Sequence, residues 1–147
     1  MQIRKMLAAF ISFMMIYPVV SVSAFAVDET QIVTDLVSPA YEYAAKTENY
    51  LTITSSTADC KSLCNGMAGV TQITVEHTLE KHWGLWIWNE VDGASWSHII
   101  SGSSGKVTNS KSGLESGTYR LKSVFTLTTL NGETETITVY SDEKTRL

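Results

Sequence analysis

Apolar and polar residues alternate along several short segments, and this alternation constrains the fold more than any other feature of the sequence. Within residues 73–79, Ile73, Val75 and Leu79 alternate with threonine and glutamate, which predicts a half-buried β-strand. Residues 119–127 alternate in the same way, and Asn131-Gly132 then supplies a strong hairpin signal before a further alternating segment. No helical period of any length is present from Tyr50 onward, so the sequence predicts an all-β fold.

The spacing of the turn signals predicts the architecture. About eight candidate strands are separated by turns every 8–15 residues or so, as in a two-sheet sandwich. Two of them are expected at residues 82–91 and 96–100, with Asp92-Gly93 as the turn between them. We therefore predict an antiparallel, immunoglobulin-like β-sandwich of 7–8 strands. A small closed β-barrel is the alternative, because the number of strands does not separate the two.

The N-terminus has the three parts of an export signal. Residues 4–5 are basic, residues 6–17 are apolar with one serine, and residues 24–26 (Ala-Phe-Ala) match the small-x-small pattern that signal peptidase recognises. We predict cleavage after Ala26 and a secreted or cell-surface location. An uncleaved membrane anchor is the competing interpretation, since residues 6–26 are about long enough to span a bilayer.

These features divide the chain into three parts. Residues 1–26 are the predicted signal peptide, residues 27–48 a flexible arm or linker, and residues 49–147 the β-sandwich domain. Within the arm, residues 41–45 form a short helix in one interpretation, and in another the arm is an ordered strap laid over the sandwich.

The charge of the exported chain limits its partners. Cleavage removes two of the 11 basic side chains and none of the 15 acidic ones, which leaves 9 − 15 = −6. Nucleic-acid binding needs clustered Lys and Arg to displace counterions from phosphates, so we expect no nucleic-acid partner. We also expect no stable transmembrane segment after cleavage, and an extracellular glycan or an envelope protein as the partner.

Cys60 and Cys64 are the only cysteines. Export favours a disulfide. On one extended strand, however, their Cα atoms lie about 13 Å apart, whereas a disulfide spans only about 4.4–6.8 Å. Either residues 61–63 make a turn that joins them, or the two are buried thiols on one strand face, which the spacing favours. The histidines show no metal-ligand spacing, so we expect no metal and no cofactor; they are His77, which we assign to the core or its rim, His82 and His98.

Three segments carry a family resemblance. They are Leu79-Glu80-Lys81 followed by a tryptophan-rich strand, the segment GTYRLK at residues 117–122, and the segment ETETITVYS at residues 133–141. In this order they resemble an uncharacterised group of small exported proteins of Gram-positive, gut-type bacteria. The resemblance covers about residues 50–147 and implies export and a β-sandwich, with no activity attached. The tryptophans and the two cysteines depart from that pattern.

Four tryptophans lie within fourteen positions, at Trp83, Trp86, Trp88 and Trp96. On a continuous strand, Trp86 and Trp88 would share one face. The two rings then either fill the core or form an exposed apolar shelf, which soluble proteins rarely leave without a partner. Sugar rings stack on such aromatic faces, and Glu90 and Asp92 are near enough in sequence to bind sugar hydroxyls.

Two non-catalytic functions follow from these residues. The first is a binding module for a glycan or surface ligand through the Trp83–Trp96 region. The alternative is a structural or adhesive protein–protein module of the cell envelope. We predict that the protein is not an enzyme, because no carboxylate pair, nucleophile elbow or nucleophile–base arrangement stands out in the sequence.

Overall fold

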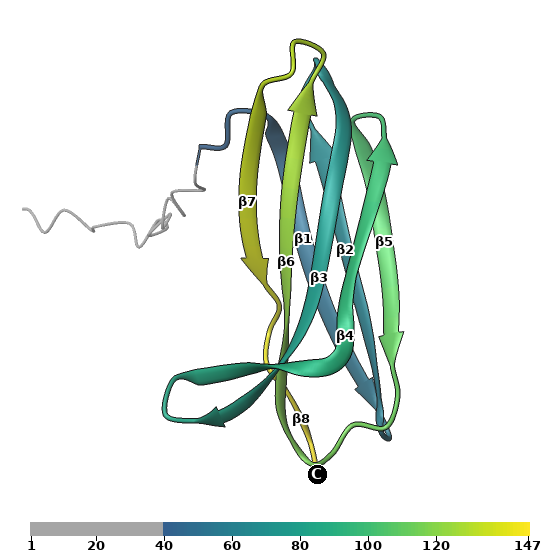
Figure 1. Ribbon diagram of the computed structural model, residues 1–147, viewed down its shortest axis with the longest axis vertical. Coiled ribbons are helices and arrows are strands. Elements are labelled where there is room, and N and C mark those ends of the chain that lie inside the picture. The colour runs from purple at the N-terminus through teal and green to yellow at the C-terminus, as the bar shows by residue number, and fades with distance from the viewer. Residues whose placement is uncertain (1–39) are drawn as a thin grey trace, which may run out of the picture. The chain divides into compact units, whose positions relative to one another are not determined.

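Eight β-strands make up the part of the chain that the computed structural model describes, residues 40–147 (Figure 1). One sheet has the order β1-β2-β5 and the other the order β4-β3-β6-β7, with β8 also paired to β6; every pairing is antiparallel. The strands are β1 (Ala44–Thr54), β2 (Thr57–Gly66), β3 (Val70–Gly84), β4 (Ile87–Ser101), β5 (Ser104–Lys111), β6 (Gly117–Thr129), β7 (Thr134–Tyr140) and β8 (Lys144–Arg146). The predicted two-sheet sandwich is confirmed. The barrel alternative is wrong, because the two sheets do not close on each other.

The predicted signal peptide, its cleavage site and most of the predicted arm lie outside the described residues. At the start of the described part, Ala44–Glu48 belong to β1, so this strand begins five residues before the expected domain boundary. The expected helix at residues 41–45 does not form. The backbone N–H groups of Glu42 and Tyr43 instead donate to the carboxylate of Glu135 on β7, each at 2.8 Å. No helix in residues 40–147 has the length and apolar character needed to cross a membrane.

Tyr119 stabilises the connection from β5 into β6. Its ring is buried, and its hydroxyl donates to the carbonyl oxygen of Glu115, four residues upstream, at 2.6 Å. A tyrosine hydroxyl bonded to the backbone a few residues upstream is the geometry of the tyrosine corner of immunoglobulin-like sandwiches. This bond holds the loop at residues 112–116 against the start of β6.

Two apolar clusters fill the interior, and a layer of polar side chains separates them. On β2, Ser62 lies between Cys60 of one cluster and Cys64 of the other. On β3, His77 lies in the same way between apolar neighbours two residues before and after it. We call this layer the polar belt; it consists of Asn49, Ser62, His77, His98, Asn109 and Ser123.

Hydrogen bonds across the polar belt join the two sheets. The amide nitrogen of Asn109 donates to Nδ1 of His77 at 2.9 Å, so the imidazole proton lies on Nε2, which donates to Oγ of Ser62 at 2.6 Å. Nε2 of His98 donates to the amide oxygen of Asn109 at 2.9 Å. No buried side-chain nitrogen or oxygen in residues 40–147 lacks a partner, as is usual for buried polar groups.

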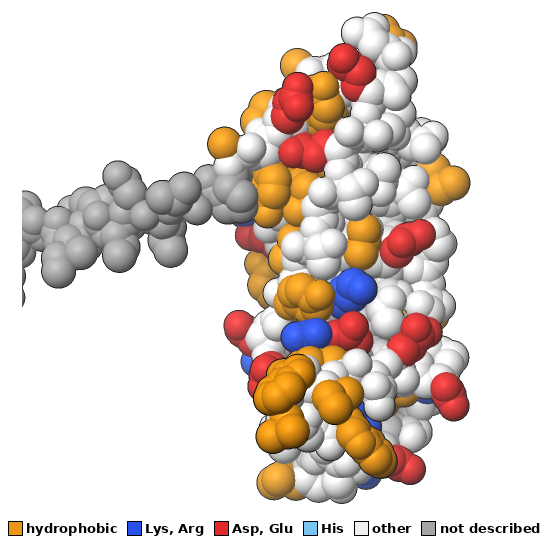
Figure 2. All heavy atoms as spheres, turned by 60° about the vertical axis from the view of Figure 1, so that its left-hand side comes forward, with side chains coloured by type: hydrophobic (Ala, Val, Ile, Leu, Met, Phe, Trp, Pro, Cys, Tyr) orange, Lys and Arg blue, Asp and Glu red, His pale blue; other side chains and the backbone are white. Residues whose placement is uncertain are grey.

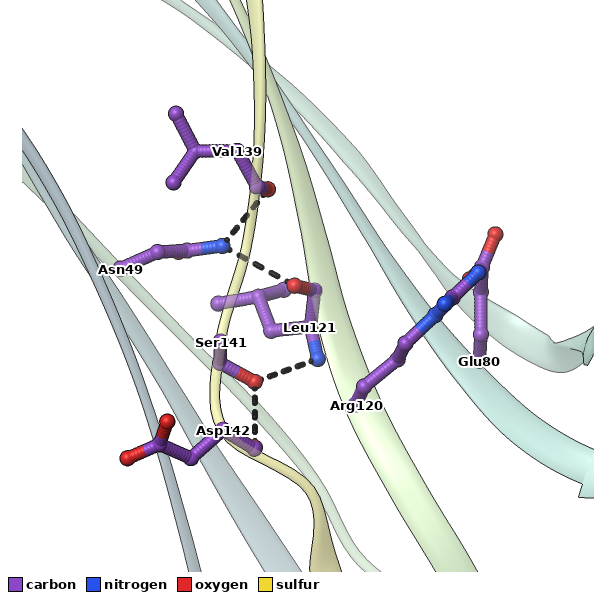
Figure 3. A network of polar contacts seen from close by, with 7 residues as sticks. All are labelled: Asn49, Glu80, Arg120, Leu121, Val139, Ser141 and Asp142. Carbon is purple, nitrogen blue, oxygen red and sulfur yellow. Dashed lines mark hydrogen bonds and ion pairs between the residues drawn. The ribbon is translucent and has the colours of Figure 1, made fainter. Parts of the chain in front are cut away.

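On the other side of the sandwich, Asn49 completes the belt. Its amide nitrogen donates to the carbonyl oxygens of Leu121 at 2.9 Å and Val139 at 3.0 Å (Figure 3). Ser123 donates to its amide oxygen at 2.9 Å. Next to these bonds, Oγ of Ser141 accepts the backbone N–H of Leu121 at 2.9 Å (Figure 3). Ser141 thereby continues the pairing with β6 where β7 has ended.

The cysteines lie on opposite sides of the belt. Cys60 packs in the cluster with Leu79 and Cys64 in the cluster with Val75. Both are free and buried. Burial, aided by a nearby acidic side chain, raises the pKa of the Cys60 thiol to about 12 and that of Cys64 to about 11. Both are therefore neutral, packed as small apolar groups.

Acid should destabilise the sandwich through His77. Burial, with a smaller contribution from His98, lowers the pKa of His77 from 6.5 to about 4. The unfolded chain therefore binds a proton below pH 6.5 that the folded chain does not bind until pH 4 or so. The contribution of the neutral His77 to the free energy of unfolding is complete above pH 6.5, and it is lost as the pH drops from 6.5 towards 4. We expect the free energy of unfolding, measured with urea, to be about 2 kcal/mol lower at pH 5 than at pH 7.5.

The matched variants for this prediction are His77→Gln and His82→Gln. The first removes the buried imidazole and should flatten the pH dependence, whereas the second, on the surface hairpin, should preserve it. An equally steep loss of stability in His77→Gln and in the wild type would contradict the assignment.

Candidate binding site on the β3–β4 hairpin

The outer part of the β3–β4 hairpin bends away from the sheet (Figure 1). Thr78 pairs with Ser95, but Glu80 pairs with Glu90, so four residues of β4 face only Leu79 of β3. This excess forms a β-bulge, and Gly93 within it has a φ of 64°, a conformation that glycine adopts at little cost. The predicted turn at Asp92-Gly93 is therefore wrong, because both residues lie in the bulge of the continuous strand β4.

The actual turn is the two-residue loop Leu85-Trp86, flanked by the paired residues Gly84 and Ile87. Trp86 thus lies in a loop and not on a strand. The prediction that Trp86 and Trp88 share one strand face is wrong for this reason.

Arg120 clamps the bent hairpin onto the sheet. Its guanidinium carbon lies 4.2 Å from the ring centroid of Trp88 on β4 and 4.2 Å from that of Tyr140 on β7. Its Nε donates to the carboxylate of Glu80 at 2.7 Å (Figure 3). The His82 ring also packs against Trp88, with 4.9 Å between centroids. One planar cation therefore joins three strands of the sheet through two aromatic contacts and an ion pair.

A groove lies on the opposite face of the hairpin. Lys81 and Asn89 are paired there, and this face continues the interior side of the sheet, because Lys81 also pairs with the buried Tyr119. The groove has a volume of about 500 Å³, within the range of small-molecule sites, about 300–1,000 Å³. Its main lining residues are Lys81, Trp83, Asn89, Glu90, Asp92, Lys111, Leu114 and Glu115. We call it the hairpin groove.

Charges of both signs surround the hairpin groove. Nζ of Lys81 lies 2.8 Å from the carboxylate of Glu115 and connects the hairpin to the loop before β6. This contact raises the pKa of Lys81 and lowers that of Glu115, so both are charged at neutral pH. Trp83 leaves 75% of its surface exposed at the rim. The groove thus combines an aromatic wall with donors and acceptors from both sides.

The end of the hairpin carries a cluster of exposed apolar side chains, which we call the apex: Leu85, Trp86 and Ile87. Leu85 and Trp86 are 80% and 81% exposed, and Ile87 is 46% exposed. Figure 2 shows hydrophobic side chains gathered on the lower part of the face where the hairpin projects, next to acidic and basic ones. Leu85 also adopts a φ of 51°, a left-handed conformation that disfavours leucine. Leucine at position 85 gains little from burial and adopts an unfavourable φ, so it does not stabilise the fold.

The structure brings together only some of the residues that the sequence singles out. Trp83, Glu90 and Asp92 line the hairpin groove. Trp88 is half-buried against Arg120, and Trp96 is half-buried against the apolar cluster around Leu79, so neither lines the groove. Cys60 and Cys64 are in the core. Within residues 40–147, no group of three or more His, Cys, Asp or Glu side chains is placed to hold a metal ion.

Sequence reasoning missed the contributions of Lys81, Lys111, Glu115 and Arg120. Lys111 ends β5 and Glu115 lies in the connection to β6, and only the folded chain brings both of them to the groove. The Tyr119 within the GTYRLK segment was a usable signal, since a tyrosine at the start of such a strand often anchors the preceding loop.

Ser62, His77 and Asn109 have the order of a nucleophile, base and orienting group. Ser62 is 1% and His77 0% exposed, so no substrate reaches the serine. In addition, the serine oxygen accepts the imidazole proton, whereas an activated nucleophile donates its proton to the imidazole. This chain of contacts belongs to the core.

Comparison with known proteins identifies no family. No protein-family model matches the sequence, and no curated protein is significantly similar to it. Among solved structures, the chain is similar to OgpA from Akkermansia muciniphila, with a TM-score of 0.37 and 13% identity over 72% of this chain and 31% of that one. It is also similar to Spo0M, a sporulation control protein from Bacillus subtilis, with a TM-score of 0.33 and 11% identity over 67% of this chain and 48% of that one. The chain thus spans less than half the length of either protein.

Replacing Arg120 should loosen the hairpin. In Arg120→Ala the stacking on Trp88 and Tyr140 and the ion pair with Glu80 are all lost, so we expect a loss of about 1–2 kcal/mol in the free energy of unfolding. Amide hydrogens of residues 80–90 should exchange faster. Lys122→Ala, two residues further along β6, is the matched control and should leave exchange in the hairpin unchanged. Equal exchange in Arg120→Ala and the wild type would show that Arg120 does not hold the hairpin.

Replacing Leu85 should stabilise the protein. Asparagine and glycine adopt a φ near 51° at lower cost than leucine. We therefore expect Leu85→Asn and Leu85→Gly to raise the free energy of unfolding by about 0.5–1 kcal/mol. Chemical denaturation measures this change, and a loss of stability in both variants would mean that Leu85 has a stabilising contact.

Proposed function

We propose that this protein is a secreted, non-catalytic binding module that binds a carbohydrate in the hairpin groove. The observation that carries the proposal is the exposed ring of Trp83 at the rim of a groove lined by amide, carboxylate and ammonium groups. Secretion is supported by the signal pattern of residues 1–26.

The chemistry of the groove favours a neutral ligand with many hydroxyls. A ligand with a fixed negative charge would be repelled by Glu90, Asp92 and Glu115, and one with a fixed positive charge by Lys81 and Lys111. A sugar offers donors and acceptors in turn around its ring and presents an apolar C–H face to an aromatic side chain. It therefore matches both the mixed polar lining and the wall formed by Trp83.

The groove is also held in shape before a ligand arrives. Arg120 fixes the hairpin from the outer face, and the Lys81–Glu115 ion pair connects it to the loop before β6. Preorganisation of this kind reduces the entropy lost on binding. It also explains why the aromatic side chain that faces the groove is Trp83, since Trp88 is already engaged by Arg120.

Two tryptophans of the same hairpin provide the test. The purified protein is applied to a glycan array, and the affinity for the best glycan is measured by calorimetry. Trp83→Ala should weaken binding about tenfold or more, because a stacking contact of an aromatic ring is lost. Trp86→Ala, a similarly exposed tryptophan that does not line the groove, is the matched control and should change the affinity less than about twofold.

A polar variant locates the ligand further. Asp92→Asn should weaken binding, because a carboxylate makes a stronger hydrogen bond to a hydroxyl than an amide does. Retention of no glycan by the wild type, or equal retention by the wild type and Trp83→Ala, would overturn the proposal.

A further inference from the structure

We infer that the apex of the hairpin inserts into the interface of a lipid bilayer. This inference concerns Leu85, Trp86 and Ile87 at the end of the hairpin. It is independent of the carbohydrate proposal, which concerns the groove beside it.

The distribution of charge around the hairpin supports insertion. Residues 82–89 contain no Asp, Glu, Lys or Arg, although charged residues make up 18% of the chain. Charged residues flank this uncharged segment directly on both strands. They are Glu80 and Lys81 on β3 and Glu90 and Asp92 on β4. A charged side chain is costly within a bilayer, whereas the interface tolerates it. The change from uncharged to charged residues therefore marks the depth to which the hairpin enters.

The backbone of the turn is also prepared for an apolar environment. Inside a bilayer, water does not satisfy free N–H and C=O groups, so they need partners within the protein. Gly84 and Ile87 are paired across the hairpin. Nε2 of His82 lies 2.8 Å from the carbonyl oxygen of Leu85 and donates to it, so this carbonyl of the loop has an internal partner.

The kind of side chain fits the interface as well. Tryptophan is enriched where the polar headgroups meet the acyl chains, because its ring is apolar and its N–H is polar. Here Trp86 lies in the loop, with Leu85 and Ile87 beside it as purely apolar groups. Such an arrangement suits an insertion depth of about 5–10 Å.

A protein partner fits the apex less well. A stable protein interface buries about 800 Å² on each side, and the apex is three side chains on a projecting two-residue loop. Aromatic side chains bury about 150–250 Å² each, so the apex alone supplies less than such an interface needs. A bilayer needs no complementary surface, and a small convex apolar projection is enough to enter it.

Neutral vesicles test the inference. The purified protein is mixed with phosphatidylcholine vesicles, and the bound fraction is measured by co-sedimentation and by the blue shift of tryptophan emission. The wild type should bind, and Trp86→Ala and Leu85→Asn should each lower the partition coefficient about tenfold. Binding should persist at about 1 M salt, where the Debye length is only ~3 Å.

Leu130→Asn is the matched control. Leu130 is 82% exposed in the turn between β6 and β7, at the opposite end of the sandwich from the apex (Figure 1). This variant should bind vesicles like the wild type.

Three results would overturn the inference. They are no binding at about millimolar lipid, an equal loss of binding in Leu130→Asn and Leu85→Asn, and self-association that depends on Leu85 without vesicle binding. None of them bears on the groove, because the Trp83 test measures glycan binding in the absence of lipid.

Discussion

The polar belt is the constraint on which the rest of the structure depends. Each inward position at the middle of a strand would ordinarily hold an apolar side chain, and here three central strands place Ser62, His77 and Ser123 there. Buried groups of this kind cost about 1–3 kcal/mol each when their partner is lost. His77 and Ser123 of the five-stranded sheet therefore require polar partners from the three-stranded sheet. Asn109 is the partner of His77, and Asn49 is the partner of Ser123. Apolar packing alone tolerates small sliding of one sheet over the other, whereas these directional bonds do not.

The same constraint fixes the position of the hairpin. His77 fixes the position of β3 over β2 and β5 of the facing sheet, because its ring is hydrogen-bonded to Ser62 on β2 and to Asn109 on β5. Two residues later, Leu79 faces the bulge of β4, and from Glu80 outward the hairpin leaves the plane of the sheet. Arg120 then holds the bent part against Trp88 and Tyr140. The groove forms between two parts of the chain that are both held in place. One is the hairpin, which leaves the sheet after Leu79, and the other is the loop at residues 112–116, which Tyr119 anchors.

The fold was largely predictable because the alternation of apolar and polar residues is a local property of a strand. Residues 73–79 and 119–127 lie where the pattern predicted, with His77 in the core as expected. The hairpin was not predictable by the same reasoning. Glycine adopts a positive φ in a β-bulge as readily as in a hairpin turn. The Asp92-Gly93 pair therefore does not distinguish a bulge from a turn. The actual turn has leucine at the positive-φ position, where propensity favours glycine or asparagine.

The candidate site was predictable only in part, and the reason is that one strand has two faces with different neighbours. Alternation along the hairpin places Lys81 and Trp83 on one face and Glu80 and His82 on the other. The second face is occupied by Arg120, a residue forty positions away whose contact no local pattern reveals. Once this face is engaged, the groove face and the apex are the parts of the hairpin left to meet a ligand. Their chemistry differs, since one combines charges of both signs with an aromatic ring and the other has no charge at all. A hairpin built only for stability would have a short polar turn in place of the apex, and would not need its outer half held so firmly by the sheet.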